Sequence, residues 1–148
     1  YADGDGVEHL TAKAPGSVFN PLRIDEDIVK DRMHLPYQNG REVFKNAVKR
    51  MPEAINVALE HNNLSVDDVS LVVAHQANRR ILEACAERMK LPMEKMYINI
   101  QKYGNTTAAT IPIALCEAIK EGKFTKGDNI ILTAFGAGYT WASAAIKW

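Results

Sequence analysis

The sequence predicts an α/β fold, built as one layered unit in which short apolar segments alternate with helical ones. The run Leu71–Ala74 is continuously apolar and is followed by residues 77–90, where apolar side chains recur every three or four positions. The same order returns further on, with a helical pattern over residues 107–120 and strand-like patterns over residues 129–135 and 141–148. The expected order is β–α–β–α–β–β, which is typical of α/β proteins.

The first sixty residues predict one long helix clearly and the shorter elements before it only weakly. Val7–Ala12 has the composition of a short strand, and residues 13–38 read as irregular because Pro and Gly interrupt them, with a short helix expected within Ile24–Met33. The segment Gly40–Asn62 predicts a long helix, and Pro52 inside it should kink or split that helix, because Pro lacks the amide N–H. The helical spacing is carried by the apolar residues Val43, Phe44, Ala47, Val48, Met51, Ile55, Ala58 and Leu59.

The middle of the chain predicts a strand followed by a helix. Ser65 with Asp68 three positions later indicates a capped single turn. Leu71–Ala74 is typical of a buried parallel strand. The helix over residues 77–90 should end before Pro92. Its expected buried face consists of Ile81, Leu82, Cys85 and Met89.

The next two elements are a short strand and an apolar helix. Met96–Ile100 has the length and composition of a strand, and Thr107–Lys120 has helical spacing. That helix is apolar on most of its circumference, so we expect it to be buried on most sides. Pro112 falls early in it, where Pro is best tolerated.

The chain then predicts a turn and a hairpin. Lys126-Gly127-Asp128 has turn composition, and Asn129–Phe135 and Trp141–Trp148 are strand-like. The short loop Gly136-Ala137-Gly138 joins them, as expected for a tight hairpin connection.

Composition narrows the class of protein. The 148 residues are 47% hydrophobic and 24% charged, with 18 basic and 18 acidic residues and no net charge. This balance argues against a nucleic-acid binder that works by bulk charge. No apolar run approaches the length of a membrane span, the first ten residues do not resemble a signal peptide, and two Cys fit a reducing cytoplasm. The chain begins at Tyr1 within a turn-like segment, which we interpret as a piece of a longer protein.

Two polar residues are candidates for chemistry. His75 ends the apolar strand and Asn105 precedes the apolar helix, so both fall at turns where α/β proteins hold ligands. An imidazole N–H and an amide N–H can jointly hold a carbonyl oxygen that gains negative charge. Taken singly, each has a plain structural explanation, as a turn residue or a helix cap. The loop around Ala137 is a hairpin turn or a source of a backbone N–H donor.

A nucleophile is missing from this pattern. Cys85 and Cys116 lie in the middle of predicted helices on largely apolar faces, so we interpret both as small buried hydrophobes. The His and acidic residues have no metal-ligand spacing, so no metal is expected.

Basic side chains recur along two predicted helices. Such stripes are usually solvated faces, and they also suit a phosphate-bearing or acidic partner. One stripe consists of Arg41, Lys45 and Lys49, and the other of Arg79, Arg80 and Arg88.

Three segments together resemble a known family. They are Val73-Ala74-His75-Gln76-Ala77-Asn78-Arg79-Arg80-Ile81, Tyr103-Gly104-Asn105-Thr106-Thr107-Ala108-Ala109 and Ala134-Phe135-Gly136-Ala137-Gly138-Tyr139-Thr140-Trp141. In order and spacing they resemble the C-terminal half of β-ketoacyl-acyl carrier protein synthase III, the initiating condensing enzyme of type II fatty-acid synthesis. The resemblance implies a thiolase-like fold of layers α-β-α-β-α, of which residues 1–148 would form the single C-terminal domain.

The resemblance also implies an activity. The family condenses acyl-CoA, with acetyl-CoA the expected primer, with malonyl-acyl carrier protein, and needs no cofactor. His75 and Asn105 would stabilise the enolate, and the backbone N–H of Ala137 would hold the acyl oxyanion. Many relatives have Gly where Ala137 stands, and a strongly positive φ would strain Ala there. The nucleophilic Cys lies in the family's N-terminal half, so this chain alone should be inactive.

Binding positions follow from the same resemblance. The CoA or pantetheine arm would contact Gly40, Arg41, Phe44 and Asn78, although Arg41 stands where some members have Asn. The acidic carrier protein would dock on Lys45, Arg79 and Arg80. The other expected partners are the protein's own N-terminal half and a second copy in a cytoplasmic homodimer, with no nucleic acid and no membrane.

Three alternatives remain open at this point. The chain could belong to a related synthase that makes alkylquinolones, polyketide starters or long-chain ketones. It could be a binding module for CoA or carrier protein without chemistry. It could also be a structural subunit of a catalytic pair, although such a subunit would be expected to lose His75 or Asn105.

Overall fold

The computed structural model describes residues 1–16 and 24–148, which form two compact units. The first unit comprises Tyr1–Val43 with Gly136–Thr140, and the second comprises Phe44–Phe135 with Trp141–Trp148. Within the described residues, no helix combines the length and the apolar character that crossing a membrane requires.

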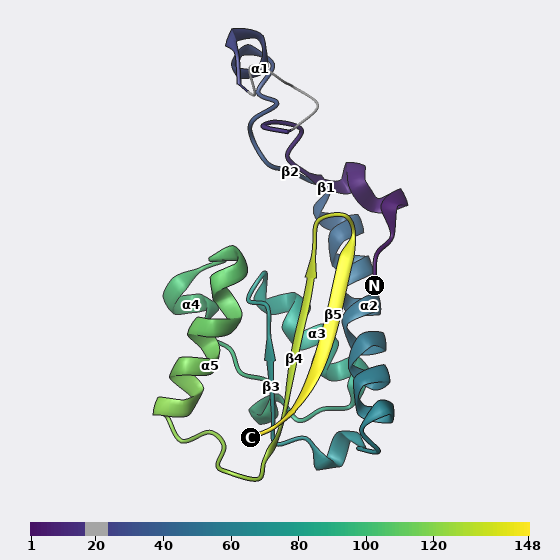
Figure 1. The fold of residues 1–148 in the computed structure, drawn as a ribbon, viewed down its shortest axis with the longest axis vertical. Helices are drawn as coiled ribbons and strands as arrows, with labels where there is room; N and C mark the ends of the chain where they lie inside the picture. The colour runs from purple at the N-terminus through teal and green to yellow at the C-terminus, as the bar shows by residue number, and fades with distance from the viewer. Residues whose placement is uncertain (17–23) are drawn as a thin grey trace. The chain divides into compact units, whose positions relative to one another are not determined.

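The second unit is built on a three-stranded sheet in the order β3-β4-β5 (Figure 1). β3 (Leu71–Ala74) runs parallel to β4 (Asn129–Gly136), with Leu71 opposite Ile130 and Ala74 opposite Thr133. All four residues of β3 are buried, which confirms the predicted buried parallel strand. β5 (Thr140–Lys147) returns beside β4 after a short loop, so the predicted hairpin is also confirmed.

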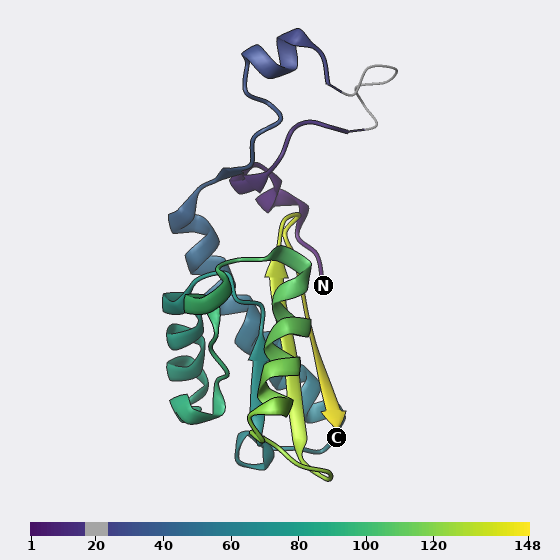
Figure 2. The same cartoon turned by 90° about the vertical axis from the view of Figure 1, so that its left-hand side faces the viewer.

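Helices cover both sides of this sheet. Figures 1 and 2 show α5 (Thr110–Lys120) on one side and α2 (Gly40–His61) on the other. The α5 side packs in one apolar cluster, whose buried members are Leu71, Val73, Tyr97, Ala114, Ala118, Phe124 and Ile130. α3 (Arg79–Met89) contacts α2 directly, because the Cys85 thiol lies 4.0 Å from the Ala47 carbonyl.

The long helix α2 passes through Pro52 without a break, so the predicted split does not occur. Pro52 removes one N–H from the helix ladder. Its neighbours Met51, Ala54 and Ile55 are all at most 3% exposed. Tertiary burial of these side chains therefore offsets the lost hydrogen bond.

The predicted face of α3 is confirmed, since Ile81, Leu82, Cys85 and Met89 are all buried. The capped turn at η3 (Val66–Asp68) is confirmed as well. There the Asp68 carboxylate accepts hydrogen bonds from the Ser65 backbone N–H at 2.8 Å and from the Ser65 hydroxyl at 2.6 Å.

The strand predicted over Met96–Ile100 is wrong. After the short turn η4 (Met93–Lys95), Met96 makes only a single parallel bridge to Val72, and α4 (Ile100–Tyr103) begins directly afterwards. The Gln76 side chain bonds the Tyr97 carbonyl and the Asn99 N–H. A side chain thus takes the backbone groups that a longer strand would have paired.

The apolar helix also differs from its prediction. A 3₁₀ turn, η5 (Thr107–Ala109), precedes α5, which begins at Thr110. Only Thr110, Ala114 and Ala118 of α5 are buried, and Ile119 is 43% exposed. The expectation of burial on most sides is therefore wrong for this chain, because α5 packs against the sheet with one face.

The first unit contains the short elements. η1 (Gly4–His9) leads into β1 (Leu10–Thr11), so the predicted strand is shorter than Val7–Ala12, and Val7 lies in the 3₁₀ turn. Asp3 caps η1 by accepting the Asp5 N–H, which favours the turn over an extended strand.

β1 pairs antiparallel with β2 (Tyr37–Gln38), a strand that the sequence did not indicate. The helix expected within residues 24–33 is present as α1 (Glu26–Lys30), capped by Asp25. Part of the stretch expected to be irregular, residues 17–23, lies outside the described residues.

Candidate active site

His75 lies directly after β3, where its backbone continues the sheet. Its N–H donates to the Thr133 carbonyl at 2.8 Å. Its half-buried side chain places Nδ1 2.5 Å from the Thr110 hydroxyl at the start of α5. Burial lowers the pKa of His75 below its ordinary value, because desolvation disfavours the imidazolium. The site therefore presents a neutral imidazole at physiological pH.

Gln76 fixes the turn that carries His75. Its side chain is 1% exposed and donates from Nε2 to the carbonyls of Ala74 at 2.9 Å and Tyr97 at 3.1 Å. Its Oε1 accepts the N–H of Asn99 at 3.0 Å. The turn after β3 is thereby tied to the segment that leads into α4.

Asn105 is exposed on the loop between α4 and α5. Its Oδ1 accepts the backbone N–H of Thr107 at 2.9 Å, and Nδ2 has no hydrogen-bond partner among residues 1–16 and 24–148. The bond to Thr107 identifies which end of the amide is oxygen, so the outward group is an N–H donor.

The same loop has unusual backbone geometry. Gly104 has φ 67° and Thr107 has φ 52°. A β-branched residue in the left-handed region is strained, and such strain gathers at functional sites.

Glu117 on α5 anchors the segment that precedes this loop. Its carboxylate accepts hydrogen bonds from the Tyr103 hydroxyl at 2.7 Å, the Asn99 amide at 2.8 Å and the Lys102 ammonium at 3.2 Å. These donors, with Tyr103 first, lower the pKa of Glu117 from its ordinary value near 4.5 to about 2. A charged Glu117 thus holds α4 against α5.

The structure connects the two predicted catalytic loops through one contact. The His75 side chain meets Thr110, which follows Asn105 on the segment leading into α5. Ala137 belongs to the first unit, where it is exposed and its carbonyl accepts the Thr140 hydroxyl at 3.0 Å. The positive φ of that loop, 139°, falls on Gly138 and not on Ala137. Ala at this position is therefore compatible with the turn.

The predicted binding residues on α3 have structural roles as well. Asn78 caps α3 by accepting the Arg80 N–H at 2.9 Å, and its side chain stays exposed. Arg79 pairs with Glu83 at 2.8 Å in an exposed ion pair, which contributes little to stability. Arg80 lies over the Phe44 ring, 5.9 Å from its centroid, so these two predicted contacts are neighbours.

The remaining predicted binding residues lie at the start of α2. Gly40, Arg41 and Lys45 are all exposed. A Cβ added at Gly40 would meet no atom within 4 Å, so packing does not require Gly there.

The two cysteines differ. Cys85 is 1% exposed, and burial raises the pKa of its thiol to about 12, so it is the inert hydrophobe that the sequence predicted. Cys116 is exposed, so its predicted burial is wrong. No group of acidic, His or Cys side chains suited to a metal ion occurs in the described part of the chain.

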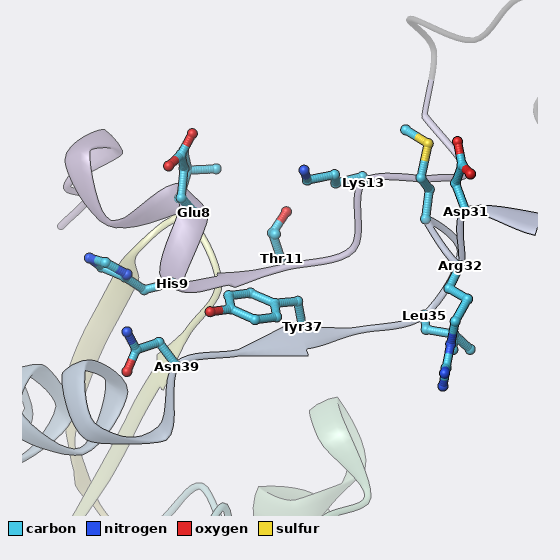
Figure 3. A pocket seen from close by; sticks show the side chains of 11 residues that line it. Glu8, His9, Thr11, Lys13, Asp31, Arg32, Leu35, Tyr37 and Asn39 are labelled. Atoms are coloured by element: carbon cyan, nitrogen blue, oxygen red, sulfur yellow. The ribbon is translucent and has the colours of Figure 1, made fainter. Parts of the chain in front are cut away.

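The first unit has a separate hollow of about 600 Å³ near β1 and β2 (Figure 3). Its walls carry both acidic and basic side chains, and none of the predicted site residues lines it. The lining residues are Val7, Glu8, His9, Thr11, Lys13, Asp31, Arg32, Met33, Leu35, Tyr37 and Asn39. The mixed charge favours no particular ligand.

Sequence reasoning missed three residues that hold the site together. They are Gln76, Thr110 and Glu117. Gln76 bonds Tyr97, 21 residues away, and Thr110 bonds His75, 35 residues away. Glu117 accepts the Tyr103 hydroxyl from the neighbouring helix. Gln76 gave a signal, since a Gln two residues after an apolar strand must satisfy its amide if it is buried.

The sheet, its flanking helices and the two polar loops define the α/β C-terminal half of the thiolase-like fold. A crystal structure of 3-oxoacyl-[acyl-carrier-protein] synthase III from Aquifex aeolicus matches with a TM-score of 0.85 and 44% identity, covering 100% of this chain and 42% of that one. The corresponding structure from Pseudomonas aeruginosa has a TM-score of 0.87 and 33% identity, covering 100% and 43%.

The sequence comparisons agree with the fold. Residues 59–148 match the family described as 3-oxoacyl-[acyl-carrier-protein (ACP)] synthase III C terminal. A beta-ketoacyl-[acyl-carrier-protein] synthase III of Chlorobium phaeobacteroides is 48% identical, over 100% of this chain and 44% of that protein. The chain belongs to the 3-oxoacyl-[acyl-carrier-protein] synthase III family. It spans less than half the length of these relatives.

Proposed function

We propose that this chain is the C-terminal catalytic part of an initiating ketoacyl synthase. The whole protein would condense an acyl group from acyl-CoA, with acetyl-CoA as primer, with malonyl-acyl carrier protein. The carrying observation is the orientation of Asn105, whose Oδ1 accepts the Thr107 N–H and leaves its amide N–H groups outward. With the neutral His75, the site offers two polar N–H groups for one developing oxyanion.

The chemistry assigns each group a task. The bond between the malonyl carboxylate and its α-carbon breaks, carbon dioxide leaves, and the electron pair moves onto the thioester oxygen as an enolate. Nε2 of His75 and Nδ2 of Asn105 donate to that oxygen. The α-carbon then attacks an acyl group held on a Cys of the N-terminal half, and the Cys thiolate departs. The N–H of Ala137 stabilises the oxyanion of this second step.

Substrate and partner contacts complete the proposal. The family resemblance suggests Gly40, Arg41, Phe44 and Asn78 as contacts of the pantetheine arm. Gly40, Arg41 and Asn78 are exposed, and a Cβ at Gly40 would meet no atom within 4 Å. The exposed cations of Lys45, Arg79 and Arg80 suit an acidic carrier protein.

The protein's own N-terminal half and a second copy are the remaining proposed partners. The N-terminal half would supply the Cys and cover apolar surface such as Ile119.

The test separates the two half-reactions in the full-length protein. His75→Ala and Asn105→Ala should each slow malonyl decarboxylation by about 10²–10³, as expected for loss of one oxyanion donor, while acyl transfer from acyl-CoA continues. His61→Ala and Asn62→Ala are matched controls, because both residues are exposed at the end of α2. Decarboxylation at the normal rate in both site variants would refute the assigned roles. Binding without decarboxylation by the unaltered protein would instead favour a non-catalytic module.

A second function is favoured by one comparison. The priming beta-ketosynthase of the R1128 polyketide pathway matches with 28% identity and a TM-score of 0.81, covering 99% of this chain and 42% of that one. A priming role would use the same His75 and Asn105 with a different acyl group. Rates with acetyl-CoA and with longer acyl-CoA primers distinguish the two.

A further inference from the structure

The tautomer of His75 decides what its side chain can do. A neutral imidazole carries one proton, on Nδ1 or on Nε2, and the hydrogen bond at one nitrogen fixes the other. The proposed function, on which the catalytic consequence here rests, needs the proton on Nε2. A group that donates to Nδ1 would therefore set the site in its working form.

Thr110 is the residue in position to do this. Its hydroxyl lies 2.5 Å from Nδ1 of His75, and its side chain is 3% exposed. The hydroxyl has one proton and two acceptors within reach, Nδ1 and the Thr107 carbonyl at 3.0 Å. If the proton went to the carbonyl, Nδ1 would have to carry the imidazole proton, and Nε2 would be left without one.

The Thr107 carbonyl does not need the hydroxyl proton. It already accepts the backbone N–H of Thr110 in the turn η5. Nδ1, by contrast, has the Thr110 hydroxyl as its partner within the described chain, and that contact is the shorter of the two. Burial lowers the pKa of His75, which agrees with a neutral ring.

We propose that Thr110 is a positioning residue, whose hydroxyl donates to Nδ1 of His75 and holds the imidazole in the tautomer with its proton on Nε2. Because Thr110 also begins α5, it fixes the ring relative to the loop that carries Asn105. Thr110 itself touches no reacting atom in this scheme.

Nitrogen NMR of the full-length protein with ¹⁵N-labelled histidine tests this directly. The His75 signals are assigned by their loss in His75→Gln. In the unaltered protein Nε2 should carry the proton and Nδ1 should have the shift of an unprotonated, hydrogen-bonded nitrogen. In Thr110→Val, which keeps the shape and removes the hydroxyl, the proton should redistribute toward Nδ1.

The kinetic readout follows the tautomer. Thr110→Val should lower kcat for decarboxylation by about 10–100-fold with little change in KM. This is the usual effect of removing a group that orients a functional histidine. Thr110→Ser keeps the hydroxyl and should recover both the tautomer and most of the rate. Thr133→Val is the matched control, because Thr133 is 2% exposed and its hydroxyl bonds the Ala142 carbonyl and Ser143 instead of the imidazole.

Two results would overturn the proposal. One is a proton on Nδ1 in the unaltered protein, which can be read even if Thr110→Val fails to fold. The other is a folded Thr110→Val with an unchanged tautomer and rate. Failure of the proposed function looks different, because His75→Ala would then decarboxylate normally whatever the NMR tautomer is.

Discussion

Replacing Gln76 with Ala should destabilise the protein more than any other single polar substitution near the site. The side chain is 1% exposed and makes three hydrogen bonds, to the Ala74 and Tyr97 carbonyls and from the Asn99 N–H. Each such bond contributes about 1 kcal/mol net, and buried groups left unpaired cost about 1–3 kcal/mol each. The substitution leaves three backbone groups unpaired, so the expected loss is at least about 3 kcal/mol.

Urea unfolding of the full-length protein measures this loss. With a slope of about 3 kcal/mol per molar, a loss of about 3 kcal/mol lowers the unfolding midpoint by about 1 M. Gln101→Ala is the matched control, because Gln101 is exposed and its one hydrogen bond, to the Ile98 carbonyl, is 3.4 Å long. That variant should stay within about 0.5 kcal/mol of the unaltered protein.

Gln76→Glu separates the contribution of the hydrogen bonds to stability from that of packing, because it keeps the size of the side chain. A carboxylate still accepts from the Asn99 N–H but faces the Ala74 and Tyr97 carbonyls without protons to donate. It should be as destabilising as Ala at pH 7 and recover partly at low pH, where the carboxyl is protonated. The reasoning is refuted if Gln76→Ala unfolds within about 0.5 kcal/mol of the unaltered protein, or if Gln101→Ala loses as much.

Two further predictions concern Glu117 and Gly40. Because the folded pKa of Glu117 is about 2 and its ordinary value is near 4.5, its stabilising effect is present above about pH 4.5 and is lost as the pH falls toward 2. Glu117→Gln should flatten the pH dependence of the unfolding midpoint in that range, and an unchanged slope would contradict the network. Gly40→Ala should fold normally, since a Cβ meets no atom within 4 Å, and should raise KM for malonyl-acyl carrier protein about tenfold. An unchanged KM would remove Gly40 from the proposed pantetheine contacts.

A continuous apolar run made the strand β3 predictable, and helical spacing made the larger helices predictable. Leu71–Ala74 is buried at every position, and the helix α3 buries the face that its spacing indicated. These patterns follow from local geometry, because side chains on one helix face or strand face share one environment. The strand Tyr37–Gln38 is only two residues long and exposed, so it left no pattern to find.

Side-chain hydrogen bonds between distant segments account for the main errors. The apolar composition of Met96–Ile100 favoured a strand, but Gln76 bonds that backbone and α4 starts at Ile100. The composition of a segment does not show which distant side chain will hydrogen-bond its backbone. The prediction that α5 is buried on most sides was wrong for a related reason. Residue spacing indicates which faces of a helix are apolar and not what covers them.

The catalytic roles of His75 and Asn105 stay predictions, made from their residue types at two turns and from the family resemblance. The sequence did not indicate the groups that contact or support these loops, because those groups belong to other segments. Thr110 reaches His75, and Glu117 holds Tyr103 just before the Asn105 loop.

These supports share one helix, because Thr110 and Glu117 both lie on α5. Thr110 contacts the imidazole near the start of the helix, and Glu117 holds α4 two turns further along. Gln76 connects the His75 turn to the same network, because it accepts the Asn99 backbone N–H while the Asn99 side-chain amide donates to Glu117. Because α5 supports both polar loops, a substitution that shifts this helix should disturb His75 and Asn105 together.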